Sequence, residues 1–571
     1  MKRVGTRNYE LRCISCNALN SERETTTYCT ECGSVLTVIY SESSSDVQYP
    51  IQEADADPLK STLSPLVSLP GLSKMYGADL HAKLDFYHPT GCFKDRGSYI
   101  EVQKALELNK EAICVASTGN MAASVSAYAC YFDLPCFIFV PEKTEEAKLA
   151  QATIYNANII RIKGDFTTCE DVCRKFSQKN DYYLAGDYVF RGEGQKVFSY
   201  ELYEQGDPHY DYIFIPIGCG TNYAAIWKGY KEMKAGGLID RLPRLVAVQA
   251  QHCSPVVEGI NKRKKVISDS VNTMATSAAV PDPVDFQKVL EAKEESDGMA
   301  ITVSENEILS ALREMAVVEG HFTEPASALP LAAFIKQVDQ FKDQKCLFAL
   351  TGTGLKDTKV VTKHSLASPV LPPDIEQVQN FVESGYLSMQ KRAWGESRET
   401  LVANLKMDPA HQQLYDHYLS RIHQKGKTLT PEETETLQSL VYGEQTNLVY
   451  PVKVTDYELT MHMHGLVKAE VKMEINGEEF VAYSEGVGPL DAVLTAVKSK
   501  SDSLLPLQVA DHQVEMLSPD TESLVVATLR LTHDNQQFEA KAASPDTIEA
   551  TLEAFLKGLA MAYKKSGDSD Y

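Results

Sequence analysis

The sequence has few of the features that mark secreted, membrane-bound or nucleic-acid-binding proteins. Positive charge is in the minority, with 56 Lys and Arg against 78 Asp and Glu, and the formal net charge is −22. Such a charge repels nucleic-acid phosphates and anionic lipid surfaces. No window of about 18 apolar residues occurs, and the basic start from Met1 to Arg7 has no apolar stretch behind it. We therefore expect a cytoplasmic protein without nucleic-acid or membrane partners.

Cysteine is absent after Cys346, although the chain contains 13 cysteines. The odd number and the lack of a signal peptide argue against a disulfide scaffold. Cysteines inside apolar runs, such as Cys114 and Cys136, are typical of small buried side chains in a reducing compartment. The cysteines near the N-terminus follow a different pattern and need their own explanation.

Two CxxC pairs, Cys13-Ile14-Ser15-Cys16 and Cys29-Thr30-Glu31-Cys32, are separated by twelve residues. Each pair can present two thiolates from one tight turn, and two facing turns form a tetrahedral four-sulfur site suited to zinc. Four protein ligands leave no open position on the metal. The spacing therefore predicts a structural zinc ribbon over residues 9–40, with ordinary or redox-active thiols as the alternative.

Between about residues 60 and 365, short apolar runs alternate with helical patterns. Such runs, followed by Gly-rich turns and helices, predict parallel strands with crossover helices in a doubly wound α/β architecture. Ligands bind this architecture where loops leave the carboxyl ends of the strands. The predicted strands cover residues 113–116, 136–140, 159–162, 212–217, 245–248 and 346–350.

Three Gly-rich loops follow predicted strands. One runs from Ala116 to Asn120 and a second from Gly218 to Asn222, and each opens a helix whose free N–H groups and dipole favour an anion. The third runs from Thr351 to Gly354, after the last strand. A single loop of this kind is often a plain strand-to-helix corner, whereas three of them favour a phosphate-binding site.

A possible nucleophile lies upstream, in Phe93-Lys94-Asp95-Arg96. A lysine beside an aromatic ring in an enclosed cleft has a lowered pKa and can attack a carbonyl to form an imine. Three consecutive charged residues are equally typical of a solvated surface. The pattern alone leaves both interpretations open.

Five motifs in this order resemble the fold-type II pyridoxal-phosphate enzymes, and among them the threonine synthase family, some members of which carry an N-terminal zinc ribbon. The resemblance covers about residues 9 to 365 and implies a two-lobed catalytic domain over residues 55–367. The motifs are Pro-Thr-Gly-Cys-Phe-Lys-Asp-Arg-Gly at 89–97, Ser-Thr-Gly-Asn-Met-Ala-Ala-Ser at 117–124, Gly-Cys-Gly-Thr-Asn at 218–222, Glu-Pro-Ala-Ser-Ala at 324–328 and Thr-Gly-Thr-Gly-Leu-Lys-Asp at 351–357.

The resemblance implies a role for each matching residue. Lys94 would bind pyridoxal phosphate and act as the acid/base that moves protons between substrate carbons, with Phe93 against the cofactor ring. Asn120 would contact the ring hydroxyl, and Thr351 would face the pyridine nitrogen. The remaining loop residues are implied to bind phosphate or carboxylate groups: Gly218, Cys219, Gly220, Thr221 and Asn222 for the cofactor phosphate, and Ser117, Thr118 and Gly119 for the substrate carboxylate.

The segment from Ala185 to Lys196 resembles the part of the family that binds the substrate phosphate. Arg191 and Lys196 would be the phosphate-binding cations. The family commonly has Asn-Ser where this chain has Gly186-Asp187, and an inward-facing carboxylate would weaken phosphate binding. The implied reaction converts O-phosphohomoserine and water to threonine and phosphate. Alternatives are a related pyridoxal-phosphate lyase, such as threonine dehydratase or cysteate synthase, and a cofactor-free amino-acid sensor.

The last third of the chain has a different pattern. Residues 368–446 are polar and helical in pattern, and we expect a helical connector there. Residues 447–565 contain alternating strand patterns, with a hairpin turn at Asn476-Gly477. The segment that begins at Phe480 aligns with the one that begins at Phe538, 58 residues later. We predict an α+β domain of two ββα-type repeats.

The segment Ser-Glu-Gly-Val-Gly-Pro-Leu-Asp-Ala at 484–492 resembles the regulatory domain of alpha-isopropylmalate synthase and citramalate synthase. In that family the domain dimerises and binds leucine or isoleucine as a feedback inhibitor. The resemblance implies an amino-acid effector near Gly486, Gly488 and Asp491, and a homodimer or higher homo-oligomer. The sequence indicates neither which effector binds nor the sign of its effect.

Overall fold

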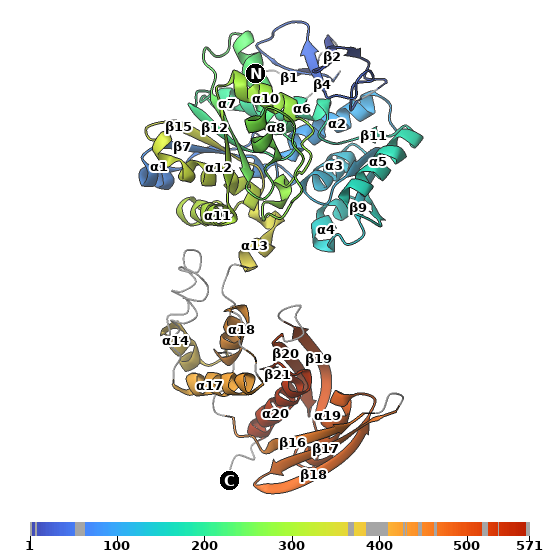
Figure 1. Cartoon of the computed structure of the whole chain (residues 1–571), viewed down its shortest axis with the longest axis vertical. Coiled ribbons are helices and arrows are strands. Elements are labelled where there is room, and N and C mark those ends of the chain that lie inside the picture. Colours follow the sequence, from blue (N-terminus) through green and yellow to red (C-terminus); the bar gives the residue numbers. More distant parts are fainter. Residues whose placement is uncertain are drawn as a thin grey trace. The chain divides into compact units, whose positions relative to one another are not determined.

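The computed structural model divides into two compact units, Met1–Val361 and Thr362–Tyr571 (Figure 1). No helix among the described residues is both long and apolar enough to cross a membrane. The domain boundaries expected near residues 55, 367 and 446 fall outside the described part of the chain. The structure describes residues 3–5, 8–24, 26–51, 63–363, 370–383, 409–425, 427, 429, 431–442, 448–461, 465–516, 523–534 and 536–566.

The smaller lobe of the first unit is built on a four-stranded parallel sheet of order β10-β9-β8-β11. Its strands are short apolar runs, as a sheet covered by helices on both faces requires. Helix α3 packs against α4, and both α3 and α5 contact β8 and β9. The elements are β8 (Ile113–Ala116), α3 (Asn120–Tyr131), β9 (Cys136–Pro141), α4 (Glu146–Ile154), β10 (Asn158–Ile162), α5 (Phe166–Asn180) and β11 (Tyr183–Leu184).

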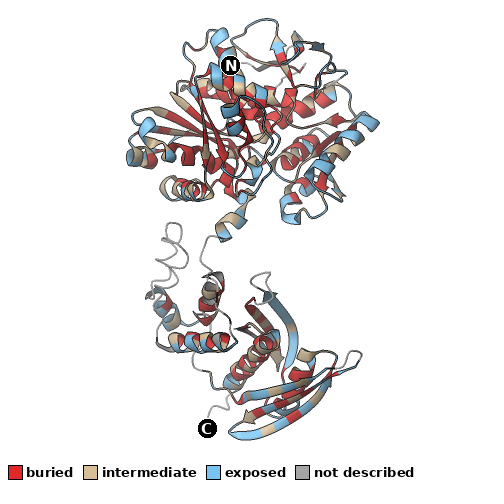
Figure 2. Cartoon of the chain, viewed as in Figure 1, coloured by how far each residue is buried: buried red, intermediate tan, exposed pale blue. Residues whose placement is uncertain are grey.

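The larger lobe contains a six-stranded sheet of order β14-β13-β12-β15-β7-β6, in which only β6 is antiparallel to its neighbour. Buried residues follow the strands of both sheets (Figure 2). The strands are β6 (Leu66–Ser68), β7 (Asp79–Leu84), β12 (Tyr212–Pro216), β13 (Arg244–Ala250), β14 (Met299–Val303) and β15 (Lys345–Leu350).

Helices cover this sheet and join the two lobes. Helix α12 contacts four of its strands, and α2 packs against α3 and α6. The doubly wound α/β fold is therefore confirmed, and all six predicted strands are present. The helices are α1 (Pro70–Tyr76), α2 (Lys94–Glu107), α6 (Val189–Gln195), α7 (Val197–Glu204), α8 (Thr221–Ala235), α9 (Pro255–Lys262), α10 (Phe286–Glu295), α11 (Glu305–Glu319), α12 (Pro325–Lys336) and α13 (Thr358–Lys363).

The N-terminal cysteines lie in a small antiparallel sheet of order β3-β2-β4, with β2 (Tyr9–Cys13), β3 (Leu19–Asn20) and β4 (Leu36–Tyr40). Polar contacts at two places hold this ribbon against the rest of the first unit. The buried Lys104 ammonium of α2 contacts Glu22 and the Tyr9 hydroxyl, at 3.0 and 2.9 Å. The Tyr40 hydroxyl donates to Glu193 of α6 at 2.5 Å. Outside this sheet, β1 (Arg3–Gly5) pairs in parallel with β5 (Val47–Tyr49).

The second unit contains two repeats around one apolar core. The predicted repeats are confirmed, and the structure adds a third strand before each hairpin. Strand β17 begins at Val467 and β20 at Val525, 58 positions later. The first repeat is β16 (Val452–Thr460), β17 (Val467–Ile475), β18 (Glu478–Gly486) and α19 (Pro489–Ser501); the second is β19 (Gln508–Met516), β20 (Val525–His533), β21 (Gln536–Ser544) and α20 (Thr547–Lys565).

The expected connector contains α14 (Ile375–Glu383), α17 (Pro409–Gln424) and α18 (Pro431–Tyr442). Helices α17 and α18 pack on β21, where Tyr418 and Leu437 bury against Leu524 and Ala543. Arg421 of α17 pairs with Glu553 of α20 at 2.6 Å. These two helices of the expected connector are therefore part of the second unit's fold.

Candidate active site

The candidate site forms where loops leave the carboxyl ends of parallel strands. The loops from Ser117, Gly218 and Thr351 follow β8, β12 and β15. A backbone hydrogen bond joins the last of them to the start of α2, because the Phe93 N–H donates to the Thr351 carbonyl at 2.9 Å. Lys94 is the first residue of α2, and its Nζ lies 5.0 Å from the centre of the Phe93 ring. The predicted nucleophile is thus held against one of the ligand-binding loops.

Asp187 is the direct partner of the Lys94 ammonium. Its Oδ1 lies 3.3 Å from Lys94 Nζ, and the two side chains are only 9% and 16% exposed. Burial alone raises the pKa of Asp187, but the positive charges of Lys94 and Arg191 outweigh it and hold this pKa below its usual value. Cys219 also hydrogen-bonds to Asp187, and burial raises the pKa of the thiol well above its usual value. Asp187 therefore links Lys94 to the second Gly-rich loop.

The loop from Gly218 to Asn222 has the features of a phosphate cradle. Gly220 adopts φ 97°, and a Cβ at this position would lie 2.5 Å from Val289 Cγ2. Thr221 and Asn222 begin α8, where free N–H groups favour an anion. Among the described residues, Thr221 Oγ1 and both polar side-chain atoms of Asn222 are buried without a hydrogen-bond partner. Unpaired buried groups of this kind are costly unless a ligand satisfies them, so the loop fits the phosphate of pyridoxal phosphate.

Asn120 contacts a buried carboxylate to which the sequence motifs assigned no role. Its Nδ2 donates to Glu324 Oε2 at 3.0 Å, and Ser277 donates to the other oxygen at 2.9 Å. Burial raises the pKa of Glu324. A Cβ at Gly352 would lie 2.4 Å from this carboxylate, which explains the glycine. Glu324 therefore belongs to the candidate site. Its position in the Glu-Pro-Ala-Ser-Ala motif was the only sign of this role in the sequence.

The Ser117 loop opens α3, and Thr351 faces inward. Ser117 Oγ accepts hydrogen bonds from the N–H groups of Gly119 and Ala122, both at 3.3 Å. Gly119 is exposed and Thr118 is half-buried, so the helix start remains open to a ligand. The buried Thr351 hydroxyl lies 3.0 Å from Ser327 Oγ. These placements agree with the predicted carboxylate and pyridine-nitrogen contacts, which stay predictions.

Arg191 lies directly behind Lys94 and Asp187, in the interior. Its side chain is fully buried and forms an ion pair with Glu101. Its Nε donates to the Gly186 carbonyl at 2.9 Å and its Nη1 to the Lys94 carbonyl at 3.3 Å. Arg191 therefore holds the Gly186 loop against the start of α2, and its guanidinium is paired with Glu101.

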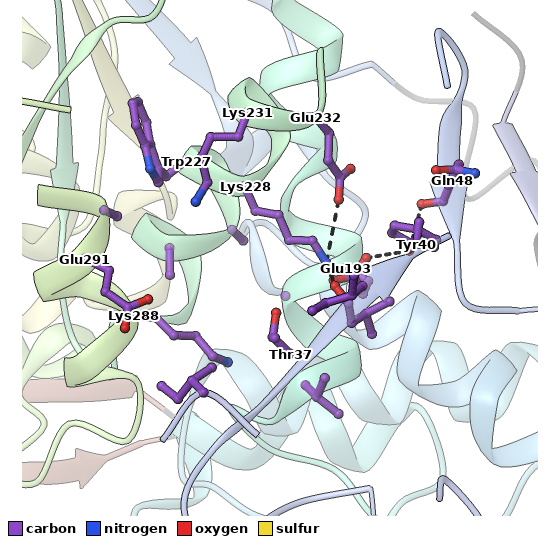
Figure 3. A pocket seen from close by; sticks show the side chains of 18 of the residues that line it. Thr37, Tyr40, Gln48, Glu193, Trp227, Lys228, Lys231, Glu232, Lys288 and Glu291 are labelled. Atoms are coloured by element: carbon purple, nitrogen blue, oxygen red, sulfur yellow. Dashed lines mark hydrogen bonds and ion pairs between the residues drawn. The ribbon is translucent and has the colours of Figure 1, made fainter. Parts of the chain in front are cut away.

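Lys196 forms ion pairs next to the N-terminal ribbon, beside Tyr40 of β4. Its fully buried ammonium pairs with Glu193 at 2.8 Å and Glu232 at 2.9 Å, and it lies 4.3 Å from the centre of the Tyr40 ring. Figure 3 shows Lys228 of α8 reaching the same carboxylates beside Tyr40. The structure does not bring Lys196 to Lys94 and Asp187, which weakens the prediction that it binds a substrate phosphate.

The four N-terminal cysteines converge as the zinc prediction requires. The Sγ atoms of Cys13, Cys16, Cys29 and Cys32 all lie within 4.8 Å of one another, and no other candidate metal cluster occurs in the described part of the chain. The Cys13–Cys32 and Cys16–Cys29 sulfur pairs are 3.5 and 3.7 Å apart. A tetrahedral zinc site with Zn–S bonds of about 2.3 Å has sulfur–sulfur edges of about 3.8 Å. The thiols therefore fit a structural zinc ion.

The predicted effector residues lie at the start of α19. Gly488 precedes this helix, and no described side chain caps it. Asp491 accepts a hydrogen bond from the Val487 N–H at 3.0 Å, and a Cβ at Gly486 would lie 2.7 Å from that carboxylate. Asp491 thus fixes the loop, and Gly486 leaves room for it.

Comparison with known proteins agrees with this geometry. The family model described as pyridoxal-phosphate dependent enzyme matches residues 61–352. Threonine synthase from Methanocaldococcus jannaschii is 37% identical over 311 residues, which are 53% of this chain and 77% of that protein. The chain belongs to the threonine synthase family of pyridoxal-phosphate dependent enzymes. The family's catalytic region therefore corresponds to the first unit.

Two further members of the family cover similar regions. The threonine synthase from Methanosarcina acetivorans is 32% identical over 399 residues, which are 66% of this chain and 98% of that protein. The one from Bacillus sp. is 36% identical over 332 residues, which are 57% of this chain and 92% of that protein. A second family model, the LeuA allosteric (dimerisation) domain, matches residues 429–563. This match begins before β16 and includes α18, which agrees with the packing of that helix.

Proposed function

We propose that the chain is a threonine synthase that converts O-phosphohomoserine and water to L-threonine and phosphate. The observation that carries the proposal is the placement of Lys94 at the start of α2, bonded through Phe93 to the Thr351 loop, in a chain of this family. The phosphate cradle from Gly218 to Asn222 supports pyridoxal phosphate as the cofactor.

Each part of the site has a separate task in this reaction. Pyridoxal phosphate, when bound, supplies an electron sink for negative charge at the substrate carbons. Lys94 Nζ takes the proton from Cα and later moves a proton at Cβ. Thr221, Asn222 and the first N–H groups of α8 hold the cofactor phosphate, and the start of α3 receives the substrate carboxylate. Asp187 holds the Lys94 side chain through the ion pair between them.

Phosphate release from O-phosphohomoserine by the purified holoenzyme tests this proposal, with threonine measured as the second product. Lys94→Ala should lower the rate at least about 1,000-fold, because the proton-transfer group is lost. Lys110→Ala, which removes a lysine paired with the exposed Asp181, is the control and should retain the wild-type rate. No phosphate release, together with turnover of threonine or phosphoserine, would identify a different lyase of the same fold.

We also propose that the second unit binds leucine or isoleucine and forms a homodimer. The match to the LeuA allosteric (dimerisation) domain and the uncapped start of α19 support this role. An effector acts only if it binds two states of the enzyme with different affinity. At least one of the two amino acids should change the rate of phosphate release by the full chain and leave a fragment of residues 1–363 unaffected. If neither amino acid changes the full chain's rate, the second unit serves assembly alone.

A further inference from the structure

Asp187 places a carboxylate at the centre of the candidate site. Its Oδ1 lies 3.3 Å from Lys94 Nζ, and Cys219 of the phosphate cradle hydrogen-bonds to it. A substrate bound near Lys94 must therefore lie close to Asp187. Because the Lys94 and Arg191 charges hold the pKa of Asp187 below its usual value, its carboxylate adds a negative charge to the surroundings that the substrate meets.

The two cations of the segment that was expected to bind the substrate phosphate are already paired with carboxylates. Arg191 is fully enclosed and paired with Glu101, and Lys196 is paired with Glu193 and Glu232. A substrate phosphate with two negative charges would thus approach Lys94 and Asp187. Neither Arg191 nor Lys196, the two residues expected to bind it, would be free to pair with it. Like charges repel strongly in a site of low dielectric constant, so the second negative charge is disfavoured there.

We propose that Asp187 is a specificity-determining residue, which admits the substrate phosphate in its singly charged, protonated form. A protonated phosphate oxygen donates a hydrogen bond that a carboxylate oxygen accepts, whereas a fully ionised phosphate offers acceptors alone. Lys94 at the same time attracts the remaining negative charge. The inference rests on the proposed function, because it concerns the phosphate that leaves during that reaction.

Other titratable groups also face Asp187. Glu101 of α2 pairs with Arg191 and accepts a hydrogen bond from the Gly186 N–H at 2.9 Å, and burial, partly offset by the Arg191 charge, raises the pKa of Glu101 to about 7. Glu170 of α5 interacts electrostatically with Asp187. Burial, together with this negative charge, raises the pKa of Glu170. Because Glu101 titrates near neutral pH, the contribution of Asp187 is the difference between the pH profiles of the wild type and an Asp187 variant.

The first experiment compares kcat/KM for O-phosphohomoserine between pH 5.5 and 8 in the wild-type, Asp187→Asn and Asp187→Ser holoenzymes. The second pKa of a phosphate ester is about 6, so at pH 8 only about one molecule in a hundred is singly charged. The ratio of wild-type to variant kcat/KM should therefore fall at least about tenfold over this range. Glu146→Gln, which removes an exposed carboxylate paired with Arg161, is the control and should keep the wild-type profile. Parallel profiles for wild type and both Asp187 variants would overturn the proposal.

The second experiment needs only the wild type, and so does not depend on a variant that folds. The sulfate ester of homoserine carries one negative charge on its ester group throughout this pH range. It is tested as a competitive inhibitor of phosphate release. Between pH 5.5 and 8, the change in its affinity should be at least about tenfold smaller than the change in kcat/KM for the phosphate ester. Equal changes would assign the pH dependence to the enzyme and overturn the proposal. Absence of phosphate release at every pH would instead refute the proposed function.

Discussion

Charged residues next to Lys94 fix the start of α2 from inside the protein. The buried Arg96 guanidinium donates to Asp85 at 2.9 Å and to Glu201 at 2.8 Å. Asp95 accepts a hydrogen bond from the Thr90 N–H at 2.8 Å. Buried charges are tolerated when each one is paired and hydrogen-bonded. The run Lys-Asp-Arg is therefore an interior structure, and the alternative of a solvated surface run is wrong.

Arg96→Ala should lower the free energy of unfolding of the first unit by about 3–5 kcal/mol, because it leaves Asp85 and Glu201 with an uncompensated buried charge. Urea unfolding followed by circular dichroism measures the change. Arg174→Ala removes an exposed pair with Asp171 and should change stability by less than about 1 kcal/mol. If Arg96→Ala and Arg174→Ala change the free energy of unfolding equally, the buried Arg96 ion pairs do not stabilise the first unit as predicted.

The sequence predicted which residues occupy the site loops, because the loops follow recognisable strands and contain local motifs. It did not predict contacts between distant segments. Asp187 is 93 positions from Lys94, and Arg191 is 90 positions from its partner Glu101. Spacing alone cannot indicate which buried charges pair across such separations. For the same reason Arg191 and Lys196 were expected to face a substrate, whereas their charges are balanced in the interior.

At the level of elements, the ribbon strand β4 is coupled to α6 through Glu193. Burial alone raises the pKa of Glu193, but Lys196 and Lys228 outweigh it and lower this pKa to about 2. An unfolded glutamate titrates near pH 4.3. The stabilisation by ionised Glu193 is therefore complete above about pH 4.3 and is lost as the pH falls towards 2.

Glu193→Gln should cost about 3 kcal/mol of stability at pH 7, and this difference from the wild type should vanish as the pH approaches 2. Unfolding free energies measured at several pH values provide the test. Glu10→Gln, at an exposed pair with Arg12, is the control and should differ from the wild type by less than about 1 kcal/mol at any pH. A Glu193→Gln difference that does not depend on pH would contradict the prediction.

Zinc removal should destabilise the ribbon and, through it, the first unit. The ribbon contacts α2 at Lys104 and α6 at Glu193, so a disordered ribbon removes at least one hydrogen-bond partner from each of these buried charges and exposes both to water. We expect one zinc ion per chain by atomic absorption and a lower melting temperature after chelation. Cys16→Ser should reproduce the effect, whereas Cys130→Ser, at an exposed cysteine outside the cluster, should not. A chain that is equally stable without zinc would contradict the structural role.

The ease of predicting a strand from the sequence differed between β8, β12 and β7. The strands β8 and β12 are continuous apolar runs and were predicted within one residue. Strand β7 was missed because His81 and Lys83 break its apolar pattern, although Lys83 is fully buried and pairs with Glu201 at 2.9 Å. A sequence pattern does not reveal a buried lysine whose partner lies in another element.

At the scale of the whole molecule, each unit has its own apolar core. Because α17 and α18 bury Tyr418 and Leu437 against the second unit, a fragment of residues 447–571 lacks part of that core. We expect a fragment of residues 404–571 to be more stable by at least about 2 kcal/mol, as for the loss of a buried large side chain. Chemical denaturation of the two fragments measures the difference. Equal stability of the two fragments would indicate that α17 and α18 only connect the two units.

The two repeats of the second unit differ at the start of their helices. Gly488 precedes α19, whereas Asp546, 58 positions later, precedes α20 and accepts hydrogen bonds from the Ile548 and Glu549 N–H groups. In the second copy the Asp546 carboxylate caps the helix. In the first copy no side chain at that position does so, because the residue is a glycine. Of the two copies, the first therefore has the helix start without a side-chain cap, where a ligand carboxylate could bind. Calorimetric titration with an amino-acid effector should therefore saturate at one molecule per chain, and not at two.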